Sequence, residues 1–163
     1  MGGRTLPVHK SGAELDLLIA VVDGTRVGLP LEHVREVLPA MASVPLPNAP
    51  AVVTGLVNLR GEPLPLLDLR RRLGRDPREV MTDDHVVVCD VRGRPVGVWV
   101  DRASDVLRLA GDDLLPVDDV APMDHVAGAV MVADGVLLVH DVPAFLSLDE
   151  ELALDRALAE VET

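Results

Sequence analysis

The residue types that most often perform chemistry are present in this chain, but their spacing forms no catalytic or metal-binding motif. No two histidines lie two or four positions apart, the spacing that places two zinc ligands on one strand or helix face. No serine occupies a Gly-x-Ser-x-Gly elbow, and the chain has no Gly-x4-Gly-Lys-Ser/Thr phosphate loop. We therefore expect no catalytic residue, no metal and no cofactor, and a hydrolase is the weakest of the functional hypotheses. The histidines and serines that lack such a context are His9, His33, His85, His125, His140, Ser11, Ser43, Ser104 and Ser147.

Acidic residues gather between positions 112 and 124, but their order does not match a calcium-binding loop. Asp112, Asp113, Asp118, Asp119 and Asp124 lack the Asp-x-Asn/Asp-x-Asn/Asp-Gly sequence that brings oxygen ligands together, so we expect a solvated loop. The single cysteine follows three valines in the apolar run 85–91 and has no partner for an internal disulfide. We expect this small side chain to be buried.

The overall charge excludes several classes of partner. Lys and Arg total 15 against 27 Asp and Glu, which gives a net charge of -12. Such a protein repels a phosphate backbone and an acidic lipid surface, so we expect no nucleic-acid binding and no direct membrane insertion. One basic run interrupts this pattern. We interpret it as an exposed helix face, and a contact patch for an acidic partner remains the alternative; it comprises Arg70, Arg71, Arg72, Arg75 and Arg78.

The segment from Asn48 to Leu69 contains the one candidate for a binding site. It predicts a strand, a turn at Arg60-Gly61 and a second strand, in which two prolines suit an edge or a bulge. The turn itself does not require a guanidinium group, and the five donors of Arg60 can reach a carboxylate or carbonyl of a partner. A solvated turn residue is the alternative that remains open.

Composition and patterning predict a mainly β fold with an aliphatic core. The chain of 163 residues is 48% hydrophobic but contains one Trp, one Phe and no Tyr, and short Val- and Leu-rich runs are interrupted by Gly, Pro and Asp. The composition is that of a folded domain. The longest apolar run, residues 17–22, is far shorter than the ~20 residues that span a bilayer, so a cytoplasmic location is the default expectation.

An internal repeat predicts how the strands are organised. A shift of 69 residues places Val27-Gly28 on Val96-Gly97, and a shift of 73 places Gly55 on Gly128. Each half then holds about five short strands, a number that closes into a small barrel. A half of this size barely supports its own core. We therefore expect two pseudo-symmetric five-stranded barrels that pack through a shared hydrophobic core.

The ends of the chain differ from this body in composition. Residues 1–14 have no periodicity and are expected to form a flexible leader, and residues 15–148 a single domain of two interleaved barrels. Short helical pieces are expected over 31–34 and 68–73, the second ended by Gly74. Residues 149–163 are expected to form a helical tail. Its capping box pairs Ser147 with Glu150, and its apolar stripe comprises Leu154, Ala157, Leu158 and Val161.

The turn segment also resembles a known family. Asn-Ala-Pro before an Asn-Leu-Arg-Gly turn, followed by Leu-Pro-Leu-Leu-Asp-Leu, is similar to the signature of CheW-like chemotaxis coupling proteins. The similarity extends over about 15–148 and includes Val-Arg-Glu-Val at 34–37, Val-Gly-Val-Trp-Val-Asp at 96–101 and Ser-Asp-Val-Leu at 104–107. It implies two SH3-like five-stranded barrels around a common core. The proline-rich stretch 41–47 and the scarcity of aromatics depart from the usual pattern.

The resemblance further implies a function without catalysis. CheW-like proteins are adaptors that join the cytoplasmic tip of transmembrane chemoreceptors to the regulatory domain of a CheA-type histidine kinase, and such partners can form arrays. The resemblance implies that the receptor-binding positions of the family correspond in this sequence to Val34, Glu36, Gly55, Asn58 and Arg60. The kinase-binding residues stay unassigned. An adaptor of a pilus-motility or other receptor array, and a small-ligand sensor with a cavity between the barrels, are the alternatives.

Overall fold

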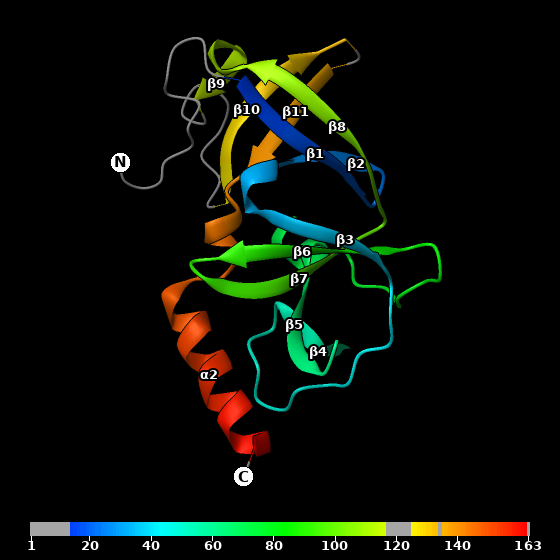
Figure 1. The fold of residues 1–163 in the computed structure, drawn as a ribbon, viewed down its shortest axis with the longest axis vertical. Coiled ribbons are helices and arrows are strands. Elements are labelled where there is room, and N and C mark those ends of the chain that lie inside the picture. Colours follow the sequence, from blue (N-terminus) through cyan, green and yellow to red (C-terminus); the bar gives the residue numbers. More distant parts are fainter. Residues whose placement is uncertain (1–13, 117–124, 134, 163) are drawn as a thin grey trace.

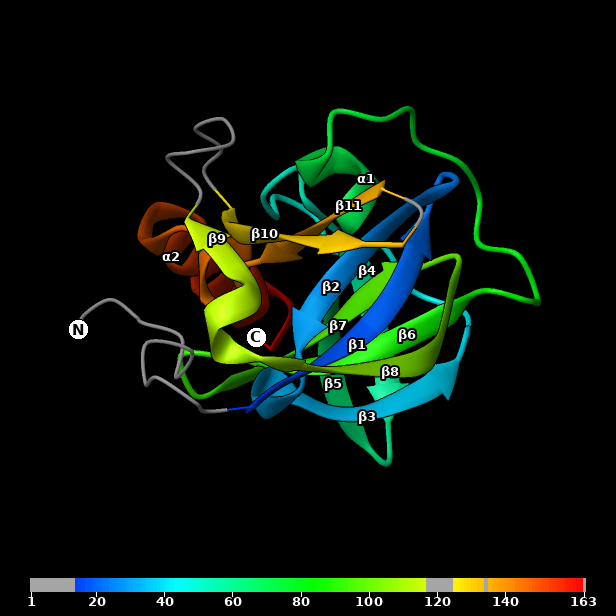
Figure 2. The ribbon, with the colours of Figure 1, turned by 90° about the horizontal axis from the view of Figure 1, so that it is seen from above.

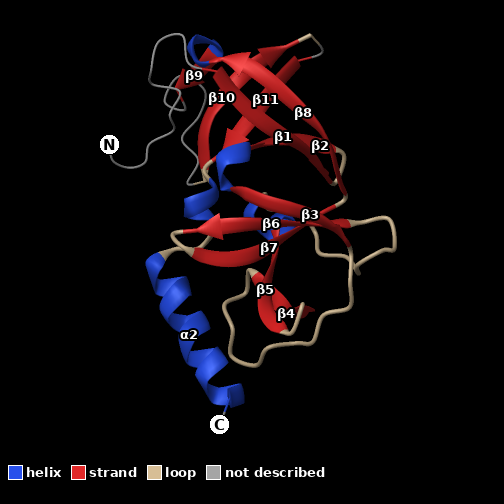
Figure 3. Cartoon of the chain, viewed as in Figure 1, coloured by secondary structure: helices blue, strands red, loops and turns tan. Residues whose placement is uncertain are grey.

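The strands form two separate sheets that lie one above the other in the ribbon views (Figures 1 and 3). The structure, a computed structural model, describes residues 14–116, 125–133 and 135–162. Residues 1–13 of the leader predicted over 1–14 lie outside these residues, as do the aspartates 118, 119 and 124, whereas Glu14 begins the first strand. The strands are β1 (Glu14–Val22), β2 (Thr25–Pro30), β3 (Val34–Pro39), β4 (Val53–Leu59), β5 (Glu62–Asp68), β6 (His85–Val91), β7 (Arg94–Val100), β8 (Arg102–Ala110), β9 (Leu114–Pro116), β10 (Val126–Val132) and β11 (Gly135–His140).

Short helices connect the strands. They are η2 (Leu31–His33), α1 (Leu69–Arg72), η3 (Gly111–Asp113), η5 (Val142–Phe145) and the longer α2 (Leu148–Glu162). The helical pieces expected near 31–34 and 68–73 are thus confirmed. Asp68 caps α1 by accepting a hydrogen bond from the backbone N–H of Arg70, and Gly74 follows the helix with a φ of 70°, the left-handed conformation that glycine adopts most readily.

Each sheet closes into a barrel. One sheet has the order β8-β1-β2-β11-β10-β9 and the other β3-β6-β7-β5-β4 in the described residues. We call them barrel A and barrel B. In barrel A the two edge strands, β8 and β9, are consecutive in the chain and joined by η3. In barrel B the chain leaves edge strand β3 and reaches the other edge, where Val44 forms a bridge with Leu56 of β4. The predicted mainly β, double-barrel fold is confirmed. Barrel A has six strands instead of the expected five, because the short β9 pairs with β10 at its edge.

The internal repeat is visible residue by residue in the pairing of the strands. In barrel B, β5 and β7 are parallel and Leu66 faces Gly97; in barrel A, β11 and β2 are parallel and Val139 faces Gly28. These two pairs correspond under the shifts of 73 and 69. Each half of the chain gives its first hairpin, β1–β2 or β6–β7, to the barrel that is otherwise built by the other half. The barrels are therefore interleaved in the chain.

One aliphatic cluster holds the barrels together. In Figure 2, where the molecule is seen from above, barrel A lies in front of barrel B. Both faces of β1 and β6 are apolar because each strand lines its own barrel on one face and the shared core on the other. Repeat-related residues of these two strands meet in the shared core: Leu18, Ala20 and Val22 from β1, and Val87, Cys89 and Val91 from β6. The expected burial of Cys89 is confirmed, and burial raises the pKa of its thiol to about 12.

The carboxyl-terminal helix α2 packs on the body beside the β6–β7 hairpin and runs down the side of barrel B (Figure 1). Its capping box forms as predicted, since Glu150 accepts from the Ser147 N–H at 2.9 Å and donates its own N–H to the Ser147 hydroxyl at 3.1 Å. Leu154 and Ala157 are buried. Val161 is 53% exposed, so its place in the predicted apolar stripe is wrong. Val161 lies in the last turn of α2, beyond the buried residues Leu154 and Ala157 that pack against the barrels.

Candidate functional site

The turn between β4 and β5 is a two-residue hairpin loop that presents Arg60 at its tip. Leu59 pairs with Glu62, and the intervening Arg60 and Gly61 have φ values of 51° and 87°, the left-handed pair of a type I′ turn. The Asn58 side-chain oxygen accepts a hydrogen bond from the Gly61 N–H at 2.8 Å. Asn58 therefore fixes the turn from which the Arg60 side chain extends.

The Arg60 guanidinium, in the β4–β5 turn, forms an ion pair with Glu36 of β3. Its two terminal nitrogens donate to the two carboxylate oxygens of Glu36 at 3.0 and 2.7 Å, a bidentate pair. Because β3 and β4 are the two edges of the sheet, this pair joins one edge to the hairpin at the other. The hydrogen bond from Arg60 lowers the pKa of Glu36, and the same bond raises the pKa of Arg60. Both groups stay charged over the physiological range.

The Arg60–Glu36 pair remains accessible to a partner. The Arg60 side chain is 65% exposed and that of Glu36 33%. Barrel B and the segments attached to it also carry exposed apolar side chains, namely Val37 in β3, Val44 and Met81. A recess of about 360 Å³ lies between residues 40–43, which follow β3, and residues 80–82. The combination of a charged pair and exposed aliphatic side chains is typical of a protein contact surface.

Two further predicted positions support the hairpin rather than extend from it. A Cβ on Gly55 would lie within 3.0 Å of the carbonyl oxygen of Val44, so only glycine lets the 44–45 segment approach β4 this closely. Val34 begins β3 and packs partly against the shared core. The structure thus brings Glu36, Asn58 and Arg60 together, places Gly55 in the same strand as Asn58, and leaves Val34 two positions from Glu36 along β3.

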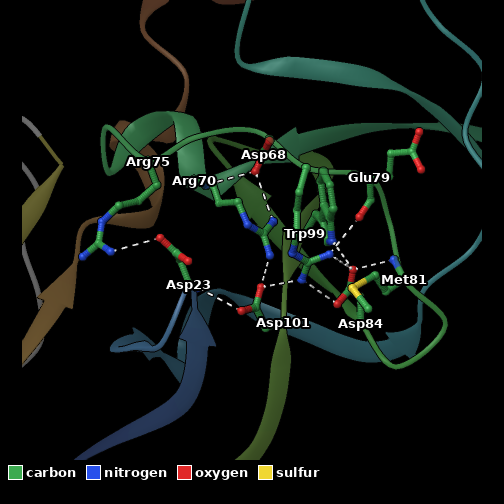
Figure 4. A network of polar contacts seen from close by, with 10 residues as sticks. Asp23, Asp68, Arg70, Arg75, Glu79, Met81, Asp84, Trp99 and Asp101 are labelled. Carbon is green, nitrogen blue, oxygen red and sulfur yellow. Dashed lines mark hydrogen bonds and ion pairs between the residues drawn. The ribbon is translucent and has the colours of Figure 1, made fainter.

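Sequence reasoning missed the exposed valines and misplaced one arginine. The expectation that Arg70 lies on an exposed helix face is wrong: its side chain is 1% exposed and stacks 4.6 Å above the ring of Trp99 (Figure 4). Other arginines of the basic run form ion pairs within the chain, Arg72 with Glu150, Arg75 with Asp23, and Arg78 with Asp84. A helical pattern alone does not reveal acceptors that are distant in sequence.

Reactive groups do not gather at this face. Among residues 14–116, 125–133 and 135–162, no group of three or more His, Cys, Asp or Glu side chains could hold a metal ion. The interface between the barrels is filled by the shared core, and a recess of about 350 Å³ lies instead at the edge of barrel A, beside Val106 and Val132. No helix of the described chain is long and apolar enough to cross a membrane.

Fold and site together define a double-barrel β protein whose exposed features suit contacts with other proteins. The model of the CheW-like domain matches residues 16–150, and the chain belongs to this family of chemotaxis scaffold proteins. The fold agrees with the crystal structure of the scaffolding protein TtCheW from Thermoanaerobacter tengcongensis, with a TM-score of 0.76 and 21% identity over 85% of this chain and 96% of that one.

Curated relatives share part of the sequence. The chemotaxis protein CheW of Rhizobium meliloti (strain 1021) is 40% identical over 83 residues, which cover 51% of this chain and 54% of the relative. Protein FrzA of Myxococcus xanthus is 35% identical over 95 residues, which cover 58% of this chain and 59% of the relative. The matched stretches thus span little more than half of these relatives. The sequence-based resemblance to CheW-like proteins is confirmed.

Proposed function

We propose that this protein is a chemotaxis adaptor that couples transmembrane chemoreceptors to a CheA-type histidine kinase in the cytoplasm and has no catalytic activity of its own. The observation that carries this proposal is the exposed bidentate pair of Arg60 and Glu36, which lies at a fixed turn of barrel B. The receptor tip would bind this face, with contacts at Val34, Glu36 and Arg60. Gly55 and Asn58 would act as positioning residues.

The adaptor would act by favouring one arrangement of receptor and kinase over another through the contacts that it makes with both. An adaptor that binds receptor and kinase through separate faces stabilises one arrangement of the two, and a receptor signal changes which arrangement is preferred. Repeated contacts in an array raise the avidity of individually weak interfaces. Affinities in the micromolar range, about -8 kcal/mol, are sufficient for each single contact.

Charge reversal at the turn tests the receptor-binding face. We expect Arg60→Glu to abolish most binding to a soluble chemoreceptor cytoplasmic fragment in a biolayer interferometry experiment, because a contact cation becomes an anion beside Glu36. The melting temperature should change by no more than about 2 °C, since the residue is exposed. Arg71→Glu is the matched control, because Arg71 is an exposed arginine on α1 that lies outside the proposed receptor-binding positions. It should bind like the wild type.

The double variant Glu36→Arg/Arg60→Glu separates a partner contact from an internal role. It keeps an ion pair between positions 36 and 60 but exchanges the two charges. The link between β3 and the β4–β5 turn is therefore retained, while the surface that a partner contacts is altered. Loss of binding in both the single and the double variant supports the proposed face. Full binding by Arg60→Glu, or recovery of binding in the double variant, would show that position 60 serves only the internal pair.

The similarity to FrzA favours one alternative, an adaptor in a different receptor–kinase array. The two candidate functions share the mechanism and differ in the partners. Titrating the protein against receptor fragments and kinases from several arrays of the source bacterium, with kinase autophosphorylation as the readout, distinguishes them. We further propose that residues 15–148 act as one binding unit and that residues 149–163 form a tail docked on it.

A further inference from the structure

The two barrels are joined by two chain crossovers that correspond under the repeat. At one, β2 passes through η2 into β3; at the other, β7 passes through Asp101 into β8. The shift of 69 residues places Glu32 in η2 on Asp101, so each crossover carries an acidic residue at the same position. What surrounds these two carboxylates differs greatly.

Asp101 connects both barrels through its backbone and its side chain. Its N–H donates to the Val21 carbonyl of β1 at 2.8 Å, and one carboxylate oxygen accepts from the N–H of Asp23, in the β1–β2 turn, at 2.9 Å. Its other oxygen accepts from Arg70 of α1 and, at 2.9 Å, from Arg78. Figure 4 shows these donors converging from different elements. One carboxylate thus binds barrel A, α1 and the segment that follows α1.

The segment over residues 75–84 is held by the same network. Arg78 forms a bidentate pair with Asp84, at 2.8 Å for both bonds, and lies 5.6 Å from the ring of Trp99. The Trp99 indole N–H donates to Asp84 at 2.9 Å. Arg75 extends the network to barrel A through Asp23 at 3.1 Å. Hydrogen bonds from Arg78, Met81 and Trp99 outweigh the effect of burial and lower the pKa of Asp84 to about 2, so this carboxylate remains charged.

A buried ionic network of this kind is an inefficient way to stabilise a fold, because the loss of hydration of its charges offsets much of their attraction. Arg70 is almost fully buried, and its second terminal nitrogen lies 3.5 Å from Asp68 without forming a hydrogen bond. Apolar residues of similar volume often stabilise a core as well as a buried ion pair does, whereas fixed ionic contacts specify one geometry. Among the residues that the structure describes, the other crossover has no comparable network: Glu32 is 43% exposed and lies 3.5 Å from its neighbour His33.

We propose that the network centred on Asp101 is a releasable clasp that sets the angle between the two barrels. Residues 75–84 form the part that releases, because Arg75 and Arg78 are the more exposed of its arginines. When the clasp opens, the barrels can change their angle about the η2 crossover, where the described residues form no ionic network that would fix them. This inference does not depend on the identity of the partners.

The test measures the distance between the barrels directly. Spin labels on Val136→Cys of barrel A and Glu62→Cys of barrel B report it by electron–electron resonance, and buried Cys89 does not compete for labelling. We expect Asp101→Asn to broaden the distance distribution by several ångström and to raise acrylamide quenching of Trp99, the single tryptophan, about two- to threefold. Glu32→Gln, the equivalent change at the other crossover, should alter neither measurement.

Arg78→Met provides a second, milder variant, because it leaves the buried Arg70–Asp101 pair intact and Arg78 is 31% exposed. If Asp101→Asn does not fold, this variant carries the test, and it should raise Trp99 quenching and broaden the distances in the same sense. Unchanged distance distributions in the folded variants would overturn the proposal, even if quenching rises. An equal effect of Glu32→Gln would also overturn it, because the clasp would then be no different from the other crossover.

Discussion

Acidification should destabilise the protein through one buried histidine. His140 ends β11 with its side chain fully buried, 5.6 Å from the ring of His125 and 6.2 Å from that of Phe145. Burial, followed by the neighbouring charge of His125, lowers the pKa of His140 from 6.5 to about 4. The folded protein therefore keeps this imidazole neutral at pH values where the unfolded chain protonates it.

The size of the effect follows from the two pKa values. Above pH 6.5 the histidine is neutral in both states and contributes no pH dependence. Between pH 6.5 and pH 4 the unfolded state binds the additional proton, so the free energy of unfolding falls as the pH falls. The loss reaches about 2.5 kcal/mol at pH 4.5 and approaches about 3.4 kcal/mol below pH 4, because each pKa unit corresponds to about 1.4 kcal/mol.

Urea unfolding at pH 7.5, 6.5, 5.5 and 4.5 measures this loss. The comparison is between the slopes of wild type and His140→Leu, because the substitution also changes packing and therefore the absolute stability. We expect the variant to lose most of the pH dependence above pH 4.5, and His33→Gln, a change at a more exposed histidine, to retain it. The same slope in wild type and His140→Leu would refute the assignment.

Two further predictions concern the close packing of the barrels. Gly55→Ala should lower the melting temperature by about 3–10 °C in a thermal melt, because the new Cβ collides with the backbone of Val44, whereas the tightest contact of a Cβ at Gly28 is the flexible end of the Leu17 side chain at 3.2 Å, so Gly28→Ala should cost less; an equal cost at both positions would contradict this reason. The Cys89 thiol, buried and with its pKa raised to about 12, should react with a maleimide only after unfolding, and rapid labelling of the native protein would contradict its burial.

The sequence was sufficient to predict the architecture because the repeat is itself a consequence of the fold. Gly28 and Gly97 recur because a Cβ at either position would crowd a repeat-related side chain of the neighbouring hairpin strand, Leu17 or Val86, so the residue types at these positions are constrained alike. Helix ends were also predicted correctly where contacts between residues close in sequence determine them. Gly74 ended α1, and Ser147 capped α2.

The predictions failed where contacts between distant residues decide the outcome. Arg70 was expected on a solvated face, yet its acceptor Asp101 and its stacking partner Trp99 come from β7 and the crossover after it. The partner of Arg60 could not be read from the sequence for the same reason, since Glu36 lies on the opposite edge strand. The turn that presents Arg60 was predictable because its conformation depends only on residues 58–61.

The exchange of hairpins between the halves has a consequence for biosynthesis. Leu17 of β1 pairs with Leu107 of β8, so the first strands leave the ribosome long before their partners exist. During that interval their apolar faces and open backbone edges have nothing to pair with, a state prone to aggregation. Because most barrel contacts join distant parts of the chain, folding should be slow for a protein of this size. Newly made chains should therefore depend on holding chaperones until translation is nearly complete.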